Sequence, residues 1–148
     1  MPRQIELEFE SGQIFRADLL EEGAPETCRL VWEALPIEVR VGHSFWYGCA
    51  LNVRLSVKLD KIENPYVLGM DRGDILLNTN PNKLTVNDSW VVPPDVFIVY
   101  GPARFFDFSG WVPCNRFARI VEGDLGKLGA IGTQLRERGV QTLKIRRV

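Results

Sequence analysis

The chain has 148 residues, of which 45% are hydrophobic and 25% are charged, and its formal net charge is −1 at pH 7. This length and composition predict a single globular domain over residues 1–148 that buries a core without disulfide or metal support. Because the net charge is close to zero and no hydrophobic run is long enough to cross a bilayer, we expect no nucleic-acid partner and no membrane partner.

The N-terminal residues predict a β-hairpin. Residues 5–10 alternate hydrophobic residues with glutamates, and residues 15–19 alternate hydrophobic with charged residues. Such alternation is typical of a strand with one buried and one solvated face. Ser11-Gly12 lies between the two segments and is a typical turn sequence, so we expect the two strands to pair.

Two segments predict helices. Pro25 is suited to the first turn of a helix, and we place this helix at about residues 25–35, before the next proline. We place a second helix at about residues 124–137, with Asp124 as its N-cap and Gly139 as its C-terminal stop. Each segment has hydrophobic residues at the spacing of one helix face, which are Cys28, Val31, Trp32 and Leu35 in the first, and Leu125, Leu128, Ile131 and Leu135 in the second.

The continuous run V-F-I-V-Y-G at residues 96–101 predicts the central strand. A run of hydrophobic residues without alternation is typical of a strand that is covered on both faces. Pro93 and Pro94 precede the run, and Pro102 follows its glycine, which indicates where the strand begins and ends. We therefore expect this strand at the centre of a soluble β core.

Shorter segments predict the remaining strands. Residues 51–59 alternate regularly between hydrophobic and polar residues, and residues 75–77, 117–121 and 143–145 are further short strand candidates. Residues 78–88 are rich in asparagine and predict a long polar loop. The total of about eight strands and two helices favours a closed barrel or a sandwich over a parallel α/β sheet.

Four segments, in chain order, resemble the cyclophilin family. They are A-P-E-T at residues 24–27, R-G-D-I-L-L-N at residues 72–78, V-F-I at residues 96–98 and F-A-R-I-V-E-G at residues 117–123. The resemblance implies a mainly β fold, a closed eight-stranded antiparallel cyclophilin-like barrel with two capping helices. More narrowly, the chain resembles small bacterial cyclophilin-like proteins of unknown function.

The positions that carry prolyl isomerase activity in cyclophilins are altered in this chain. The resemblance places Arg54 at the catalytic arginine, but Leu59 follows it where the family has a phenylalanine. Asp95 stands where the family has a glutamine, and Cys114 stands where it has a histidine. Trp111 lies two residues out of register with the family tryptophan. These changes predict that the chain lacks prolyl isomerase activity, with weak activity as the alternative.

His43 is the only histidine and is the candidate catalytic residue, because an imidazole can act as an acid or a base near neutral pH. Ser44, Trp46 and Tyr47 beside it are residue types common in binding sites. The alternative is a hydrogen-bonded or solvated histidine at a strand start. One histidine and three scattered cysteines have no metal-ligand spacing, so we expect no metal and no cofactor.

The three cysteines, Cys28, Cys49 and Cys114, form no C-x-x-C pair, and their odd number argues against a disulfide framework. The chain opens without the pattern of a signal peptide, so the expected location is the cytoplasm. Cys49 and His43 lie on one predicted strand and can meet only if the chain turns at Gly48. We expect structural roles for all three cysteines.

The segment after the central strand combines arginine with aromatic residues, which is typical of a ligand cleft. We predict a cleft lined by His43, Trp46, Tyr100, Arg104, Phe106 and Trp111. The alternative is that the aromatic residues belong to the core and that Arg104 pairs with Asp107 on the surface.

Three functional hypotheses follow from this cleft. The leading hypothesis is a non-isomerase module that binds a small molecule or a peptide. The second is an enzyme that acts on a small anionic metabolite, with His43 as the acid or base and Arg104 holding the anion through a bidentate contact. The third is a homo-oligomer in which the aromatic stretch forms the interface.

Overall fold

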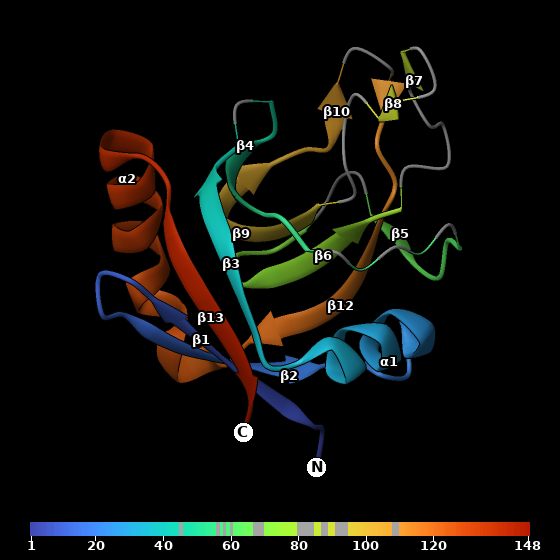
Figure 1. The fold of residues 1–148 in the computed structure, drawn as a ribbon, viewed down its shortest axis with the longest axis horizontal. Helices are drawn as coiled ribbons and strands as arrows, with labels where there is room; N and C mark the ends of the chain where they lie inside the picture. Colours follow the sequence, from blue (N-terminus) through green and yellow to red (C-terminus); the bar gives the residue numbers. More distant parts are fainter. Residues whose placement is uncertain are drawn as a thin grey trace.

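A computed structural model describes residues 1–44, 46–55, 57, 59, 61–66, 70–79, 85–86, 89–90, 95–107 and 110–148, with the backbone alone for residues 65–66, 85–86, 89–90 and 107. The strands curve into a barrel with α2 along one side and α1 at one end (Figure 1). The chain ends lie side by side, because Ile5 pairs with Arg147. No helix in the described part of the chain is long and apolar enough to cross a membrane.

Eight antiparallel strands form the barrel in the order β2-β1-β13-β3-β4-β9-β6-β12, and pairing of β12 with β2 closes it. Their bounds are Gln4–Phe9 (β1), Ile14–Leu19 (β2), Ile37–His43 (β3), Gly48–Val53 (β4), Asp74–Asn78 (β6), Val96–Ala103 (β9), Cys114–Ile120 (β12) and Gln141–Arg147 (β13). Pro65–Tyr66 (β5) pairs with β12 at the barrel edge. Two short hairpins join Thr85–Val86 (β7) to Ser89–Trp90 (β8) and Phe106–Asp107 (β10) to Gly110–Trp111 (β11). The predicted closed eight-stranded barrel is confirmed.

The helices agree with the sequence prediction except at the start of the second one. Pro25–Ala34 forms α1, and Leu128–Arg138 forms α2 after the 3-10 helix Glu122–Lys127. Asp124 is therefore not the N-cap of α2, because its carboxylate instead accepts the Arg16 backbone N–H at 2.8 Å and pairs with Lys127. Gly139 does end α2, with a φ of 88° that favours glycine.

The alternating segment at residues 51–59 forms a shorter strand than its pattern predicts. The register pairs Val53 with Val96, the first residue of β9, and this strand pair extends no further in that direction. Leu55 and Val57 nevertheless remain buried in the core. Residues 78–88, predicted as a polar loop, begin at the end of β6 and include β7, while residues 80–84 and 87–88 lie outside the described residues.

The barrel wall separates two hydrophobic clusters. The interior cluster includes Val96 and Ile98 of β9 and residues from every barrel strand, and both helices pack against it. The outer cluster consists of Tyr47, Ala50, Met70, Leu76, Phe97, Val99, Phe105, Val112 and Cys114. Because side chains alternate between the two faces of a strand, β9 contributes to both clusters. The prediction that this strand is covered on both faces is confirmed.

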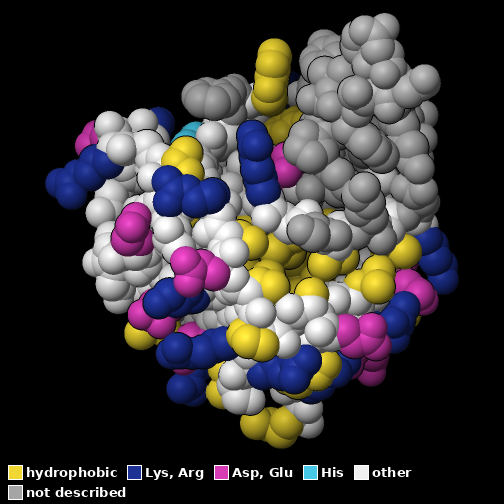
Figure 2. All heavy atoms as spheres, in the orientation of Figure 1, with side chains coloured by type: hydrophobic (Ala, Val, Ile, Leu, Met, Phe, Trp, Pro, Cys, Tyr) yellow, Lys and Arg dark blue, Asp and Glu magenta, His cyan; other side chains and the backbone are white. Residues whose placement is uncertain are grey.

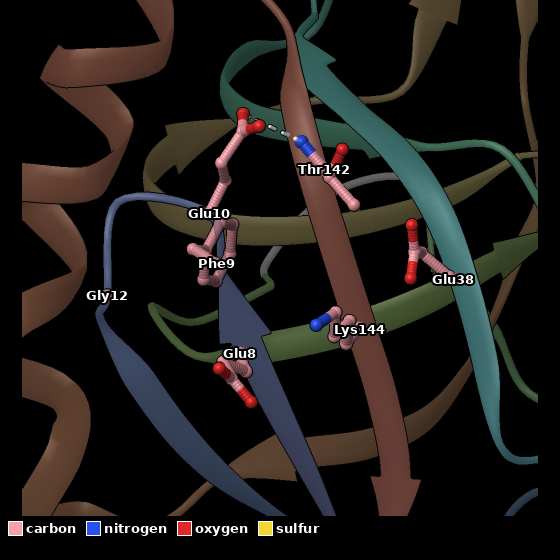
Figure 3. A pocket seen from close by; sticks show the side chains of 7 residues that line it. All are labelled: Glu8, Phe9, Glu10, Gly12, Glu38, Thr142 and Lys144. Atoms are coloured by element: carbon pink, nitrogen blue, oxygen red, sulfur yellow. Dashed lines mark hydrogen bonds between the residues drawn. The ribbon is translucent and has the colours of Figure 1, made fainter.

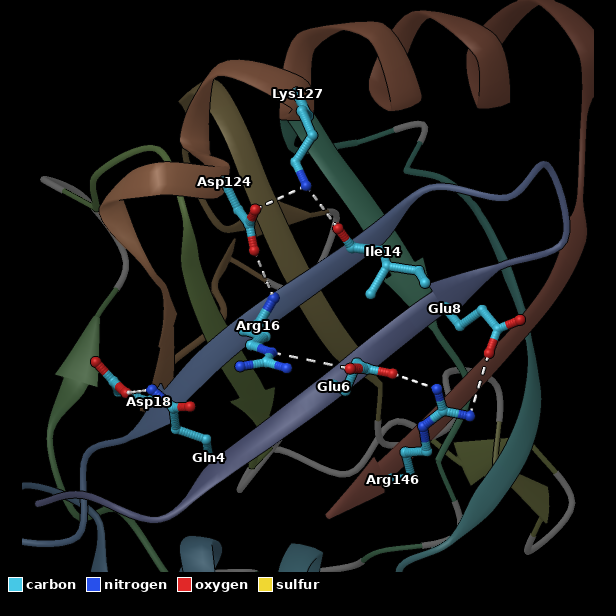
Figure 4. A network of polar contacts seen from close by, with 9 residues as sticks. All are labelled: Gln4, Glu6, Glu8, Ile14, Arg16, Asp18, Asp124, Lys127 and Arg146. Carbon is cyan, nitrogen blue, oxygen red and sulfur yellow. Dashed lines mark hydrogen bonds and ion pairs between the residues drawn. The ribbon is translucent and has the colours of Figure 1, made fainter. Parts of the chain in front are cut away.

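The outer surface of β1, β2 and β13 is charged and cross-linked by ion pairs (Figure 4). Arg146 pairs with Glu6 and with Glu8, the latter at 3.3 Å, and Glu6 also lies 3.9 Å from Arg16. In the space-filling view, hydrophobic side chains gather near the centre of the face, and charged side chains lie to the left of them and below them (Figure 2). The pattern of one buried and one solvated face predicted for the N-terminal hairpin is confirmed.

The N-terminus of α1 is capped by a residue distant in sequence. Ala24 at the N-cap position provides no side-chain hydrogen bond. The Glu63 carboxylate accepts the backbone N–H groups of Glu26 and Thr27 at 2.9 and 2.8 Å, and the Thr27 hydroxyl at 2.6 Å. Burial raises the pKa of Glu63, but these hydrogen bonds outweigh it, so that the pKa lies below its usual value. This contact attaches α1 to the chain that precedes β5.

We expect Phe97→Ala to destabilise the fold by about 3–5 kcal/mol, because the ring is 1% exposed and packs between Tyr47 and Phe105. Chemical denaturation measures the change. Phe106→Ala is the matched control, since its ring is 48% exposed, and it should change stability by less than about 1 kcal/mol. Equal losses in the two variants would contradict the assignment of Phe97 to the outer cluster.

We expect Glu63→Ala to destabilise the protein by about 1–2 kcal/mol at pH 7, as does the loss of a helix cap. The pKa of Glu63 is lowered by folding, so its stabilisation is present above the ordinary glutamate value and is lost as the pH falls through the lowered one. Denaturation of both proteins from pH 7 to pH 3 tests this. The exposed Glu22, replaced by alanine, is the control, and a loss that persists undiminished at pH 3 would refute a charge-dependent cap.

Candidate functional site

His43 and Tyr100 form a hydrogen-bonded pair between β3 and β9. The His43 Nε2 atom lies 2.6 Å from the Tyr100 hydroxyl oxygen, and its Nδ1 atom lies 2.7 Å from the Ser44 carbonyl oxygen. A carbonyl oxygen can only accept, so Nδ1 carries the hydrogen. In the neutral imidazole Nε2 is then the acceptor, and the Tyr100 hydroxyl donates to it. This orientation leaves His43 able to take a proton from Tyr100.

The Tyr100 ring lies under α2. A Cβ atom on Gly132 would come within 2.6 Å of the ring, so only glycine permits this approach. Burial raises the pKa of Tyr100, the nearby Cys49 thiol raises it further, and the charge of Arg136 on α2 opposes the rise. Tyr100 therefore connects His43, Cys49 and α2.

The other four residues of the predicted cleft lie on exposed loops and hairpins, which we call the rim. Trp46, Phe106 and Trp111 are 64%, 48% and 50% exposed, and Arg104 is also exposed. The Phe106 and Trp111 rings stand edge to face, with centroids 5.1 Å apart. The Arg104 backbone N–H donates to the Tyr47 carbonyl at 3.0 Å, which joins the β3–β4 loop to the end of β9. The three aromatic residues are thus not core residues.

The predicted cleft divides into two parts with different surroundings. His43 and Tyr100 are half-buried beside α2, whereas the rim residues face solvent. The alternative ion pair between Arg104 and Asp107 is untested, because the Asp107 side chain lies outside the described residues. A ligand spanning both parts stays a prediction.

A third polar cluster, at the start of β9, was not among the predicted site residues. The Asp95 side chain is 5% exposed, and the alternation of side chains along the strand places it on the same face as Phe97 of the outer cluster. Its Oδ2 atom accepts a hydrogen bond from Asn52 at 2.9 Å, while its Oδ1 atom is buried without a hydrogen-bond partner. An unpaired buried carboxylate oxygen costs free energy, and such groups are rare without a functional or structural reason.

Two residues that interact electrostatically with Asp95, Arg54 and Cys114, are also ones that the cyclophilin resemblance places at positions of the isomerase site. Burial raises the pKa of Asp95, and the Asn52 hydrogen bond and the Arg54 charge oppose the rise. Burial and the Asp95 charge together raise the pKa of Cys114 well above its usual value. The cyclophilin resemblance places Arg54, Asp95 and Cys114 at the family positions for arginine, glutamine and histidine, and the fold brings Asp95 within electrostatic reach of the other two. The sequence signal for this cluster was the position of Asp95, a charged residue directly before the hydrophobic run at residues 96–100.

A separate hollow of about 360 Å³ lies on the outer face of β1, β13 and β3 (Figure 3). Glu8, Glu10, Glu38 and Lys144 line it, and Glu8 and Glu10 already have partners in Arg146 and the Thr142 backbone N–H. In the described part of the chain, no three histidine, cysteine, aspartate or glutamate side chains are placed to hold a metal ion.

Comparisons with known proteins identify a family and a fold. The model of DUF3830, described as a protein of unknown function, matches residues 7–146. The structure of McbB in complex with tryptophan has a TM-score of 0.77 at 19% identity, covering 97% of this chain and 44% of McbB, so this chain spans less than half the length of McbB. The solution structure of the hypothetical protein AF2241 from Archaeoglobus fulgidus has a TM-score of 0.64 at 21% identity, covering 99% of this chain and 95% of AF2241. No curated protein matches the chain.

We expect the protein not to accelerate cis/trans interconversion of an X-Pro test peptide. A carboxylate at Asp95 and a thiol at Cys114 replace the amide and imidazole of the isomerases, so the family's set of polar groups is not rebuilt around Arg54. A protease-coupled isomerase assay measures this, with Arg54→Ala as the control. A rate above the uncatalysed one that disappears in Arg54→Ala would show that the altered set is still active.

Proposed function

The chain belongs to the DUF3830 family of proteins of unknown function, so we propose its function from the chemistry of the Asp95 cluster. We propose that it is a non-isomerase module that binds a small zwitterion of the α-amino-acid class. The observation that carries the proposal is the Asp95 Oδ1 atom, which is buried without a hydrogen-bond partner. A ligand ammonium group would provide the missing donor. We also propose that the barrel belongs to the cyclophilin-like superfamily.

The charges around Asp95 favour a ligand with two charges rather than one. Arg54 is exposed, Asn52 is half-buried and Asp95 is buried, so that positive charge lies toward solvent and negative charge lies deeper. The ammonium group of an amino acid would pair with Asp95, and its carboxylate would pair with the Arg54 guanidinium. A ligand with an ammonium group alone would leave Arg54 unpaired, and a ligand with a carboxylate alone would leave Asp95 unpaired.

The apolar surroundings favour a ligand with a hydrophobic side chain. Phe97 and Cys114 of the outer cluster share the barrel face with Asp95. McbB, of similar fold, was solved in complex with tryptophan, which combines an amine, a carboxylate and an apolar ring. This supports tryptophan as the first probe. The three cysteines are free, which supports a reducing, cytoplasmic setting.

A second candidate function is contact with a peptide or a second copy of the chain through the rim. The observation that favours it is the exposure of Trp46, Phe106 and Trp111 beside Arg104. Aromatic residues and arginine are enriched in interfaces relative to the remaining surface. The enzyme hypothesis, with His43 as the acid or base, concerns the half-buried part of the predicted cleft instead.

We expect L-tryptophan to bind more tightly than tryptamine, which lacks the carboxylate, and than indole-3-propionate, which lacks the amine. Calorimetry at pH 7.5 measures the three affinities. Asp95→Asn should weaken binding of the two amines about tenfold or more, because a hydrogen bond to a charged group contributes about 1.5–3 kcal/mol. Arg54→Ala should weaken binding of the two carboxylates. Binding of L-tryptophan should also weaken as the pH falls through the raised pKa of Asp95.

The controls separate a binding role from a structural one. Asp95→Asn should leave the free energy of unfolding unchanged or increased at pH 7.5, because it removes a carboxylate whose charged form burial disfavours. Trp111→Ala should leave the three affinities unchanged. Three equal affinities, or binding that is lost in Trp111→Ala and kept in Asp95→Asn, would reject the Asp95 site, and the latter would assign the ligand to the rim.

A further inference from the structure

Asn52 of β4 holds the Asp95 carboxylate in one orientation. Its neighbours Leu51 and Val53 belong to the interior cluster, so alternation along β4 places Asn52 on the outer face, where Phe97 of β9 also lies. The register pairs Asn52 with Phe97, and the Asn52 side chain reaches diagonally to Asp95, two residues before Phe97. Its amide nitrogen donates to the Asp95 Oδ2 atom at 2.9 Å. One oxygen of the carboxylate is thereby engaged.

The other oxygen, Oδ1, is the atom left for a ligand. It is buried without a hydrogen-bond partner, on a side chain that is 5% exposed. A ligand with a positive charge but no N–H group would attract the carboxylate and still leave Oδ1 without a hydrogen bond. At an exposed oxygen water would supply the missing donor, but a buried oxygen bears the full cost of staying unpaired. The position therefore favours a cation that donates a hydrogen bond over one that only neutralises charge.

The groups around Asp95 orient its carboxylate without a cation bound to it. Asn52 is a neutral donor. Among the described residues, the titratable groups that act on Asp95 are Arg54, which is exposed, and Cys114, a thiol that stays neutral because burial raises its pKa. An ammonium side chain in place of the Asn52 amide would pair with the carboxylate and compete with a cationic ligand. The amide instead fixes the geometry and leaves the charge of Asp95 to the ligand.

We infer that the Asp95 site selects ammonium groups that carry an N–H, and that Asn52 is the positioning residue that sets this selectivity by holding Oδ1 as the receiving atom. This selectivity rests on the proposed function and narrows its ligand class. Protonated primary, secondary and tertiary amines each have an N–H to donate and are accepted. Quaternary ammonium groups have none and are rejected. Asn52 acts through Asp95, which makes the contact with the ligand.

The test uses the full chain and tryptophan with successive methyl groups on its amine, with affinities measured by calorimetry at pH 7.5. L-tryptophan and its N-methyl and N,N-dimethyl forms all keep an N–H when protonated, whereas the N,N,N-trimethyl form keeps the charge and has no N–H. We expect the third methyl group to lower the affinity at least about tenfold, more than the first two together, because a hydrogen bond to a charged group is lost. The N,N-dimethyl form is nearly as bulky and is the matched control for size.

The role of Asn52 is tested by the pH dependence of L-tryptophan binding in Asn52→Leu, which keeps the shape of the side chain and removes the donor. The Asn52 hydrogen bond opposes the rise in the pKa of Asp95 that burial causes, so its loss should raise that pKa further. Since the carboxylate pairs with the ligand only when ionised, the pH below which binding weakens should move upward. Gln4→Leu is the matched control, because the Gln4 amide of β1 donates to the Asp18 carboxylate of β2 at 2.8 Å, and it should keep the wild-type profile.

The outcomes separate a failure of the selectivity from a failure of the proposed function. If the wild type binds none of these ligands, the proposed function is rejected and the selectivity with it. If L-tryptophan binds and its affinity falls by equal steps with each methyl group, the site responds to size, and the N–H selectivity alone is rejected. If folded Asn52→Leu keeps the wild-type pH profile, Asn52 is not the positioning residue. Asn52→Ala replaces Asn52→Leu if circular dichroism shows that the latter does not fold.

Discussion

The packing of β9 on both of its faces is the constraint on which the rest of the structure depends. Its neighbours β4 and β6 pair along its two edges, the interior cluster covers one face and the outer cluster covers the other. A strand enclosed in this way has little freedom to shift its register, because a slip of one residue would exchange its two sets of side chains. Residues held by β9 therefore occupy defined places.

Asp95 and the His43–Tyr100 pair both take their positions from this strand. Asp95 precedes its first residue on the outer face, and Tyr100 lies near its other end beneath α2, about 16 Å away along an extended chain. The two residues also lie on different faces of the barrel wall. Phe97, on the face of Asp95, packs on Tyr47 and Phe105 outside the barrel, whereas Tyr100 packs against the interior cluster. The Asp95 site and the His43–Tyr100 pair therefore lie on different sides of the barrel wall.

The Asp95 site carries a buried polar atom that a purely structural barrel has no need of. The Asp95 Oδ1 atom is buried without a hydrogen-bond partner, and a buried polar atom left unpaired in this way costs free energy. Glu63 shows the contrast, because each of its carboxylate oxygens accepts hydrogen bonds and the result is a helix cap.

The sequence alone determined the elements whose pattern is local. Alternation predicted the N-terminal hairpin, the unbroken run predicted a strand covered on both faces, and Pro25 and Gly139 marked helix ends correctly, because each of these depends on residues adjacent in the chain. Tertiary structure decided the rest. It ended β4 at Val53, where pairing with β9 ends, and it supplied the cap of α1 from Glu63. It also separated His43 and Tyr100 from the exposed rim and brought Asp95 close to Arg54 and Cys114, because contacts between distant residues follow from strand register, which no local pattern encodes.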